Sequence, residues 1–362
     1  MKAAKPKRSP RRAQARAPTH RAWPSEPGAG AERPLYLFLT EPGLSGLALL
    51  ELRHLKLAAR KARPLKLQLR NHDVLVLPSD VVSPVAGVSR LCTNVLRAGI
   101  FGRSAVTPRQ LDTLAALFRQ GGYRRLVSSL AGDHFNRLDL ARWVRQQLAA
   151  RGVALAESGR AVWMIVAGER FYFCEELQNY HDAPSRDRAS TRSGALPPTI
   201  GAAMVFAAQV SASDVAWEPT AGSGGLVGEL LSGSGASAVL ATDVDAAAVA
   251  ALRQRFADAG RLWTACADAG VAALPRADVS LTIANLPFGA HYKSQGGNAA
   301  LYSAILRNSL RHARAGWRGV FLTSDASAMT EAARRAGLAA SVAAEVKVRG
   351  MGAAIWKLER PS

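Results

Sequence analysis

Residues 199–362 alternate between short apolar runs and longer amphipathic stretches, and this alternation restricts the fold more than any other feature of the chain. Strands are expected at 214–218, 237–243, 263–267, 278–284, 318–323, 341–348 and 353–359. Helices are expected between most of them, and one more at 199–209. Strands that alternate with helices in this way form a doubly wound, mostly parallel sheet. The last two runs are joined by Gly350-Met351-Gly352, so the final strand is expected to be antiparallel.

The first half of the chain lacks this regular alternation. We expect strands at 35–39, 65–70, 73–77 and 126–130, a hairpin over 160–175, and helices at 87–99, 108–118 and 136–150. Such an order predicts an α+β region. The polar stretch 178–198 contains several prolines and is interpreted as a linker to the second half.

Positive charge is concentrated in the first half. The chain has 47 Lys and Arg against 27 Asp and Glu, a net charge of +20. Residues 197–362 hold 15 basic and 12 acidic side chains, so +17 of the excess precedes them. An excess of this kind favours a polyanionic partner, either nucleic acid or an acidic membrane surface. A nearly neutral second half is what a small-molecule site or a core-rich domain would have.

The first 25 residues hold eight of the basic side chains, no acidic one and no apolar periodicity. This composition predicts a disordered tail. A flexible arm that contacts phosphates, an organellar transit peptide and a solubilising tail all fit it. Prolines at 6, 10 and 18 oppose the transit peptide, because they would break its amphipathic helix.

The rest of the composition restricts location and cofactor type. Cys92, Cys174 and Cys266 lie far apart and form no C-x-x-C pair, so neither a disulfide framework nor a cysteine-built metal site is expected. No uncharged apolar run reaches about 18 residues, which excludes a membrane span. These features predict a cytoplasmic protein that uses no metal.

A glycine-containing loop, WEPTAGSGG at 217–225, joins the first strand of the alternating region to its helix. Its glycines allow a tight turn and a close approach to a ligand. Gly222, Gly224 and Gly225 do not fit G-x-G-x-x-G, and no Lys-Ser/Thr follows, so a pyrophosphate cradle is disfavoured. Glu218 at the strand end would repel phosphate. It would suit a cationic ligand such as the amino-acid part of S-adenosylmethionine.

Two further carboxylates end the next two strands. Asp243 lies 19 residues after Gly224, where a carboxylate can bind two ribose hydroxyls. Asp268 is placed to accept a hydrogen bond from an adenine amino group. The competing interpretation is that the loop and both acids are ordinary turn residues between strands and helices.

The loop ANLPFG at 284–289 follows the fourth strand and is the most specific motif of the chain. It resembles the Asn/Asp-x-Pro-Phe/Tyr loop of amino-methyltransferases. The exocyclic amine of a base is a poor nucleophile, because its lone pair is delocalised into the ring. The Asn285 side-chain oxygen and the Leu286 carbonyl can hold its hydrogens, Pro287 fixes the turn, and Phe288 can stack on the base. Positioning of this kind supplies much of the rate of methyl transfer.

The resemblance extends to the THUMP-containing guanine-N2 RNA methyltransferases. It rests on NLPFG…KSQGGNAALYSAILRNSLR, with Asn298, Leu301, Tyr302 and Arg311 in like positions, and on RSGALPPTIGAAMVFAA before the glycine loop. Upstream, FNRLDLARWVRQQLAARGVAL and RAVWMIVAGERFYFCEEL resemble the end of a THUMP domain, and TEPGLSGLALLEL resembles the N-terminal ferredoxin-like segment.

The resemblance implies an α/β Rossmann-like class I methyltransferase fold with a seven-stranded sheet and an antiparallel last strand, preceded by α+β ferredoxin-like and THUMP domains. The implied division is a disordered basic tail at 1–33, a ferredoxin-like domain at 34–95, a THUMP RNA-binding domain at 96–178, a linker at 179–198 and a methyltransferase domain at 199–362.

The implied activity is methyl transfer from S-adenosyl-L-methionine to guanine N2 in tRNA, by a monomer. The implied cofactor-binding residues are Thr199, Glu218, Thr220, Gly222, Gly224, Asp243, Val244, Asp268, Ala269 and Asn285. The implied catalytic residues are Asn285, Leu286, Pro287 and Phe288. Three alternatives stay open: an rRNA guanine-N2 enzyme, a DNA adenine-N6 enzyme, and an RNA-binding protein with an inactive methyltransferase fold.

Overall fold

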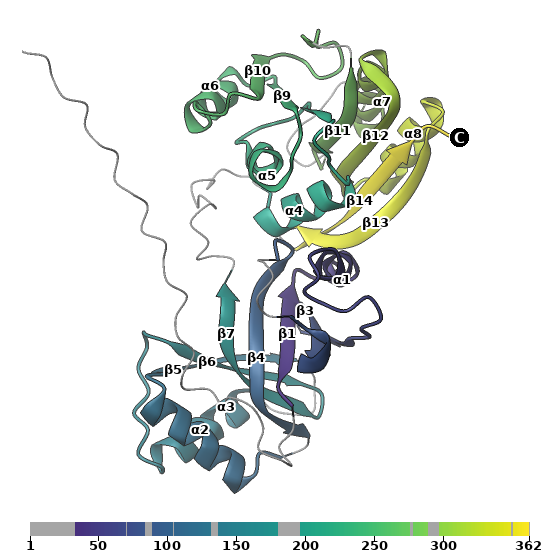
Figure 1. Ribbon diagram of the computed structural model, residues 1–362. Helices are drawn as coiled ribbons and strands as arrows, with labels where there is room; N and C mark the ends of the chain where they lie inside the picture. The colour runs from purple at the N-terminus through teal and green to yellow at the C-terminus, as the bar shows by residue number, and fades with distance from the viewer. Residues whose placement is uncertain are drawn as a thin grey trace, which may run out of the picture.

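The computed structural model describes residues 33–69, 71–83, 89–103, 105–131, 137–179, 196–275, 278–288, 297–348 and 350–361. The expected tail at 1–33 and the expected linker therefore lie almost entirely outside the described residues. The described chain contains two seven-stranded sheets, one in each half (Figure 1). Among the described residues, no helix is both long and apolar enough to span a bilayer.

The N-terminal half contains one sheet, with helices on one of its faces. Its elements are β1 (Leu35–Thr40), α1 (Ser45–His54), β2 (Leu65–Gln68), β3 (Asp73–Pro78), the short 3-10 helix η1 (Ser79–Val81), β4 (Cys92–Arg103), α2 (Pro108–Gln120), β5 (Arg125–Ala131), α3 (Arg137–Ala149), β6 (Ala161–Ala167) and β7 (Arg170–Asn179). The strand order is β2-β3-β1-β4-β7-β6-β5. The central strand β4 pairs with both β1 and β7, so the expected domain boundary between residues 95 and 96 falls inside a strand.

The helix predicted at 87–99 is wrong, because residues 92–103 form β4. Cys92 and Val95 pack in the core that includes α1, whereas Leu96 and Ala98 belong to the apolar cluster on the other face of the sheet. A strand that is covered on both faces shows no polar alternation. Its apolar residues then recur at spacings that suggest a helix.

The C-terminal half forms the predicted mixed sheet. Its elements are α4 (Pro198–Ala207), β8 (Val215–Glu218), α5 (Gly225–Gly233), β9 (Ala238–Asp243), α6 (Ala246–Arg255), β10 (Leu262–Cys266), β11 (Val279–Asn285), α7 (Gly297–Arg311), β12 (Ala313–Thr323), α8 (Ala326–Arg335), β13 (Ala339–Val348) and β14 (Met351–Glu359). The order is β10-β9-β8-β11-β12-β14-β13, and β14 runs antiparallel to both neighbours. The predicted seven-stranded sheet with an antiparallel last strand is confirmed.

Helices cover both faces of this sheet. Buried side chains of α4 and α5 share one core with Ala216, Leu281 and Val320. Those of α7 and α8 share another with Trp217, Leu240 and Phe321. The alternation of adjacent positions, such as 216 and 217, between the two cores follows from the two-residue period of a strand.

Local capping defines where several helices begin. Thr107 and Gln110 form a reciprocal capping box at the start of α2. Asp245 caps α6 by accepting from the Ala247 N–H, and Asp325 caps α8 by accepting from the Ala328 N–H. Asp245 and Asp325 lie two residues after β9 and β12, which belong to the parallel part of the sheet, so capping also fixes the geometry at the carboxyl ends of these strands.

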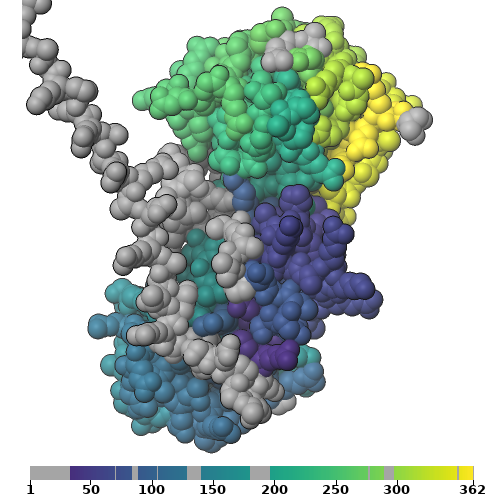
Figure 2. Space-filling model, viewed as in Figure 1, coloured from purple at the N-terminus to yellow at the C-terminus, as the bar shows by residue number. Residues whose placement is uncertain are grey.

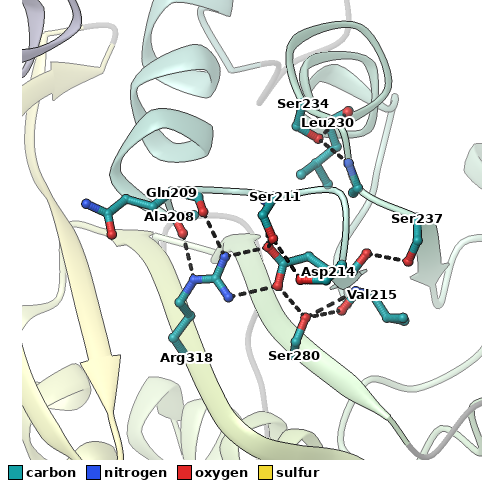
Figure 3. A network of polar contacts seen from close by, with 12 residues as sticks. Ala208, Gln209, Ser211, Asp214, Val215, Leu230, Ser234, Ser237, Ser280 and Arg318 are labelled. Carbon is teal, nitrogen blue, oxygen red and sulfur yellow. Dashed lines mark hydrogen bonds and ion pairs between the residues drawn. The ribbon is translucent and has the colours of Figure 1, made fainter. Parts of the chain in front are cut away.

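A network around Asp214 anchors the end of α4 to the sheet (Figure 3). The Asp214 carboxylate accepts two hydrogen bonds from the Arg318 guanidinium, at 2.9 and 2.8 Å, and one from Ser280 Oγ at 2.6 Å. Arg318 also donates to the Ala208 and Gln209 carbonyls that follow α4. Residues from the α4–β8 loop, β11 and β12 are thereby joined in one place.

The two halves pack directly on each other at α1, which lies between them in Figures 1 and 2. Helix α1 contacts α4 and β13, and the rings of His54 and Phe206 meet edge-on at 6.1 Å. Arg90 donates to the Glu229 carboxylate at 2.5 Å and to Ser232 Oγ at 3.0 Å, both on α5. The halves therefore share a core rather than being two separate units.

Candidate functional site

Four neighbouring strands place the predicted residues along one edge of the C-terminal sheet. Glu218, Asp243 and Asn285 are the last residues of β8, β9 and β11, and Asp268 follows β10 by two residues. These strands are parallel neighbours in the order β10-β9-β8-β11. Chain progression reverses between β8 and β11, and ligands of open α/β sheets bind outside the carboxyl ends of strands at such a point.

The glycine loop between β8 and α5 depends on two left-handed residues. Gly222 has φ +50° and Gly224 has φ +78°. A Cβ at Gly224 would come within 2.9 Å of the Phe256 ring, so both conformation and space require glycine there. A Cβ at Gly222 would meet no atom within 4 Å, so open space adjoins this part of the loop.

Glu218 is a buried carboxylate that no cation of the described chain neutralises. Glu218 is only 2% exposed, and its Oε2 atom is buried without a hydrogen-bond partner among the described residues. Burial raises the pKa of Glu218 well above its usual range and nearby Asp243 raises it further, whereas the Val227 N–H opposes them. A ligand ammonium group would supply the charge that this site lacks.

Asp243 is fixed by backbone donors. Its two oxygens accept from the Gly222 N–H at 2.7 Å and the Asp245 N–H at 2.9 Å. Each carboxylate oxygen can accept more than one hydrogen bond, so this group can still bind two ligand hydroxyls. The bond to Gly222 also attaches the glycine loop to the end of β9.

The third carboxylate and an exposed apolar residue follow neighbouring strands, β10 and β9. Asp268 accepts from the Gly270 N–H at 2.7 Å, and the adjacent Ala269 is buried. Val244 is 64% exposed, and its carbonyl accepts from the Cys266 thiol. Exposed Val244 and the Asp268 carboxylate thus follow neighbouring strands at the same edge of the sheet.

The remaining predicted cofactor residues differ in their contacts. Thr220 Oγ1 donates to the Asn285 carbonyl at 3.3 Å, which connects the glycine loop to the loop after β11. Thr199 is buried in the first turn of α4 and hydrogen-bonds to no other predicted site residue of the described chain.

The loop after β11 holds an unsatisfied acceptor. Asn285 Oδ1 is buried without a hydrogen-bond partner among the described residues. The Leu286 N–H donates to the Leu322 carbonyl at 3.0 Å, and the Pro287 carbonyl accepts from the Tyr302 hydroxyl at 2.8 Å. Phe288 is half-buried against the core. Residues 289–296, which continue this loop, lie outside the described residues.

Two site residues were missed by sequence reasoning. Thr323 Oγ1 lies 2.8 Å from the Tyr302 hydroxyl, and it accepts from the Asp325 N–H at 2.9 Å. Asp325 also accepts from Asn298 Nδ2 at 2.9 Å. The sequence signal that could have indicated them is their position at the carboxyl end of a predicted strand. The structure adds that this strand, β12, lies directly beside β11.

Part of the C-terminal half matches a known protein family. Residues 231–353 match the family described as RMKL-like, methyltransferase domain. The match begins within α5, after the glycine loop, and includes the loop after β11. No curated protein sequence matches the chain.

Solved structures extend the likeness to nearly the whole chain. TrmN from Thermus thermophilus is 24% identical with a TM-score of 0.74, covering 91% of this chain and 100% of that one. SMU.472, solved in complex with SAH, is 11% identical with a TM-score of 0.63, covering 91% and 99%. A protein from Listeria monocytogenes described as a predicted N6-adenine-specific DNA methylase is 12% identical with a TM-score of 0.63, covering 89% and 95%.

The C-terminal half therefore has a methyltransferase-like α/β fold, and residues 231–353 of it match a methyltransferase domain family. The family match and the sheet order agree on this, and the predicted resemblance to a methyltransferase family is confirmed. The similarity to TrmN, at this level of identity, shows a shared fold over both halves.

Proposed function

We propose that this protein transfers the methyl group of S-adenosyl-L-methionine to the exocyclic N2 amine of a guanosine in structured RNA, with tRNA as the substrate. The observation that carries the proposal is the buried, unpartnered Asn285 Oδ1 at the carboxyl end of β11, beside a glycine loop that begins directly after the uncompensated Glu218. One supplies an acceptor for an amine hydrogen, and the other supplies a site for a cation.

The residues present fit S-adenosyl-L-methionine. Glu218 would hold the ammonium group of its amino-acid part, and Asp243 would accept from the two ribose hydroxyls. Asp268, Val244 and Ala269 would surround the adenine. Gly222 offers the open space through which the chain of the cofactor can approach the loop. When bound, the cofactor supplies an electrophilic methyl group.

The loop after β11 would orient the target base. Asn285 Oδ1 and the Leu286 carbonyl accept the two amine hydrogens, and Phe288 stacks on the ring. Because the amine is a weak nucleophile, holding it in line with the methyl group is the main contribution that these side chains can make. To reach this position, a paired guanine would have to leave its stack.

Charge supports RNA as the partner. The first 196 residues carry +17, whereas the methyltransferase half carries +3. Lys and Arg contact the phosphate backbone, and proteins recognise structured RNA largely by its backbone and shape. The N-terminal half, which we interpret as a ferredoxin-like and THUMP region, would hold the RNA while the C-terminal half methylates one base. The same proposal includes a monomer that acts in the cytoplasm.

Two alternative substrates are kept as outcomes of the test. An rRNA guanine would use the same loop chemistry. The adenine N6 amine would use it too, and the similarity to the Listeria monocytogenes protein is the observation that favours that candidate. An inactive fold is opposed by the unpartnered acceptor at Asn285.

The experiment is to incubate the protein with labelled S-adenosyl-L-methionine and separate pools of tRNA, rRNA and DNA, followed by digestion to nucleosides. We expect N2-methylguanosine from tRNA. Label in N6-methyladenine would refute the assignment of guanine as the target base. Label confined to rRNA would show that rRNA, and not tRNA, is the substrate. No label in any pool, with the cofactor bound, would favour the inactive alternative.

Asn285→Ala is expected to lower the turnover rate by about 100-fold or more, because the amine loses one of its two acceptors. Cofactor Kd, measured by calorimetry, should change only a few-fold. Asn285→Asp is the matched control, since it keeps an oxygen at the same place and should retain part of the turnover. Loss of both turnover and cofactor binding in Asn285→Ala would show that Asn285 acts on the cofactor or the fold.

A further inference from the structure

The backbone carbonyls of the loop after β11 are not equivalent. The Asn285 carbonyl accepts from Thr220 Oγ1 at 3.3 Å, and the Pro287 carbonyl accepts from the Tyr302 hydroxyl at 2.8 Å. No described residue donates to the Leu286 carbonyl that lies between them. Two side-chain hydroxyls thus occupy the outer carbonyls and leave the middle one available.

The Tyr302 hydroxyl belongs to a chain of oriented hydrogen bonds. Tyr302 lies on α7 and is 1% exposed. Because Tyr302 donates to Pro287, it must accept from Thr323 Oγ1, 2.8 Å away, and Thr323 in turn accepts from the Asp325 N–H. Each bond orients the next, so the direction of the Tyr302 O–H is fixed by the end of β12.

Proline makes this contact important for the loop. Pro287 has no N–H, so its carbonyl is the polar backbone group through which neighbouring residues can hold it. Burial raises the pKa of Tyr302, so the hydroxyl remains a donor at neutral pH. Without that donor, no described residue would hold the Pro287 carbonyl, and the Leu286–Pro287 peptide would be restrained only from its Leu286 side, where the Leu286 N–H donates to the Leu322 carbonyl.

We propose that Tyr302 and Thr220 are positioning residues, which occupy the Pro287 and Asn285 carbonyls and so direct the Leu286 carbonyl and Asn285 Oδ1 toward the two hydrogens of the target amine. This inference rests on the proposed methyl transfer to an exocyclic amine. It assigns Tyr302 a role in the rate of the chemical step and none in binding cofactor or RNA. Thr220 has the additional effect of coupling the glycine loop to the base-binding loop.

The test is Tyr302→Phe, which removes one oxygen and keeps the ring that packs in the core. The single-turnover rate at saturating RNA and S-adenosyl-L-methionine is expected to fall about tenfold, as for loss of one hydrogen bond worth about 1.4 kcal/mol. The KM for RNA and the cofactor Kd should stay within about twofold. A merely structural role would change stability without this separation of kcat from KM.

Thr323 provides an independent test through the same chain. Thr323→Val removes the hydroxyl that donates to Tyr302 and should lower the single-turnover rate in the same direction, whereas Thr323→Ser should restore most of that rate. Tyr123→Phe is the matched control, because its hydroxyl donates to Glu175 in the N-terminal half at 3.0 Å, far along the chain from the loop. It should cost stability and leave the single-turnover rate unchanged.

The outcomes separate this inference from the proposed function. Wild-type protein that labels no exocyclic amine would overturn the proposed function, whatever the variants do. Wild-type protein that methylates, with unchanged rates in Tyr302→Phe and Thr323→Val, would overturn the positioning role alone. Equal losses in rate, RNA binding and cofactor binding would also overturn it, because they indicate a general loss of structure.

Discussion

At the residue scale, Glu218 is a buried carboxylate that costs the ligand-free protein stability. A carboxylate buried without a hydrogen-bonded cation is costly, and here one oxygen has no partner among the described residues. Its elevated pKa shows that the fold favours the protonated form. Binding of a cation would favour the ionised form, so cofactor binding and the protonation of Glu218 should be linked.

Glu218→Gln tests this linkage. Because the folded-state pKa of Glu218 lies above its unfolded-state value, the wild type loses stability as pH rises from the unfolded value through the folded one. The Gln variant lacks that loss, so the free protein should have the larger free energy of unfolding near pH 8. Its cofactor Kd should be about tenfold weaker or more, since a charge-assisted bond is lost.

Urea unfolding of the ligand-free protein and calorimetric titration with S-adenosyl-L-methionine measure the two effects. Asp258→Asn, in the exposed turn after α6, is the matched control and should change neither quantity. If the Gln variant binds the cofactor as tightly as the wild type, Glu218 does not contribute to cofactor binding.

At the scale of elements, the Asp214–Arg318 pair fixes how α4 meets the sheet (Figure 3). Burial alone would raise the pKa of Asp214, but hydrogen bonds from Arg318, Ser280 and Ser211 outweigh burial and hold it well below its usual range. A carboxylate with a lowered folded-state pKa stabilises the fold above its unfolded-state pKa. That contribution is lost as pH falls through the folded-state value.

Arg318→Leu should lower the free energy of unfolding by about 3 kcal/mol at pH 7, because the buried Asp214 loses its hydrogen-bonded guanidinium and keeps only the more distant Arg314, at 3.8 Å, as a cationic neighbour. The difference between wild type and variant should shrink below about pH 4, where Asp214 becomes protonated in the unfolded chain. Urea unfolding across pH measures both. Arg334→Leu, at an exposed pair on α8, should have little effect, and an equal loss in the two variants would contradict the assigned role of the buried pair.

Local sequence patterns predict the strands of the C-terminal half better than strand β4 of the N-terminal half. The strands from β8 to β14 occur within about five residues of their predicted positions, because each is bounded by turn residues and most are separated from the next by a helix or a glycine hairpin. Strand β4 was predicted as a helix because its two faces pack against different cores. That burial arises from segments distant in the sequence, which a local pattern does not contain.

At the scale of the whole molecule, the C-terminal half shares part of its core with the N-terminal half. Gly43 lies so close to β13 that a Cβ would come within 1.6 Å of the Glu345 carbonyl oxygen. Arg90 reaches Glu229 on α5, the helix that begins at the glycine loop. The N-terminal half and the helix that follows the glycine loop are thus in direct contact.

The isolated fragment 196–362 is therefore expected to be poorly soluble or to unfold well below the temperature of the full chain. Separation would expose the apolar surface of α4 and β13 that α1 covers. Size-exclusion chromatography and thermal unfolding measure this, and co-expression of residues 1–195 is expected to restore solubility. A monomeric fragment as stable as the full chain would show that the shared core contributes little.

The sequence by itself determined the doubly wound C-terminal sheet, its antiparallel last strand and the identity of the acidic and amide residues at the strand ends. These features depend on local periodicity and on turn residues, which neighbouring positions in the chain carry. Only the tertiary structure decided that β4 is a strand in one continuous N-terminal sheet, that α1 is packed into the core of the C-terminal half, and that Thr220 and Tyr302 donate to the Asn285 and Pro287 carbonyls at the loop after β11. Those facts depend on contacts between distant segments, whose geometry is set by packing rather than by spacing along the chain.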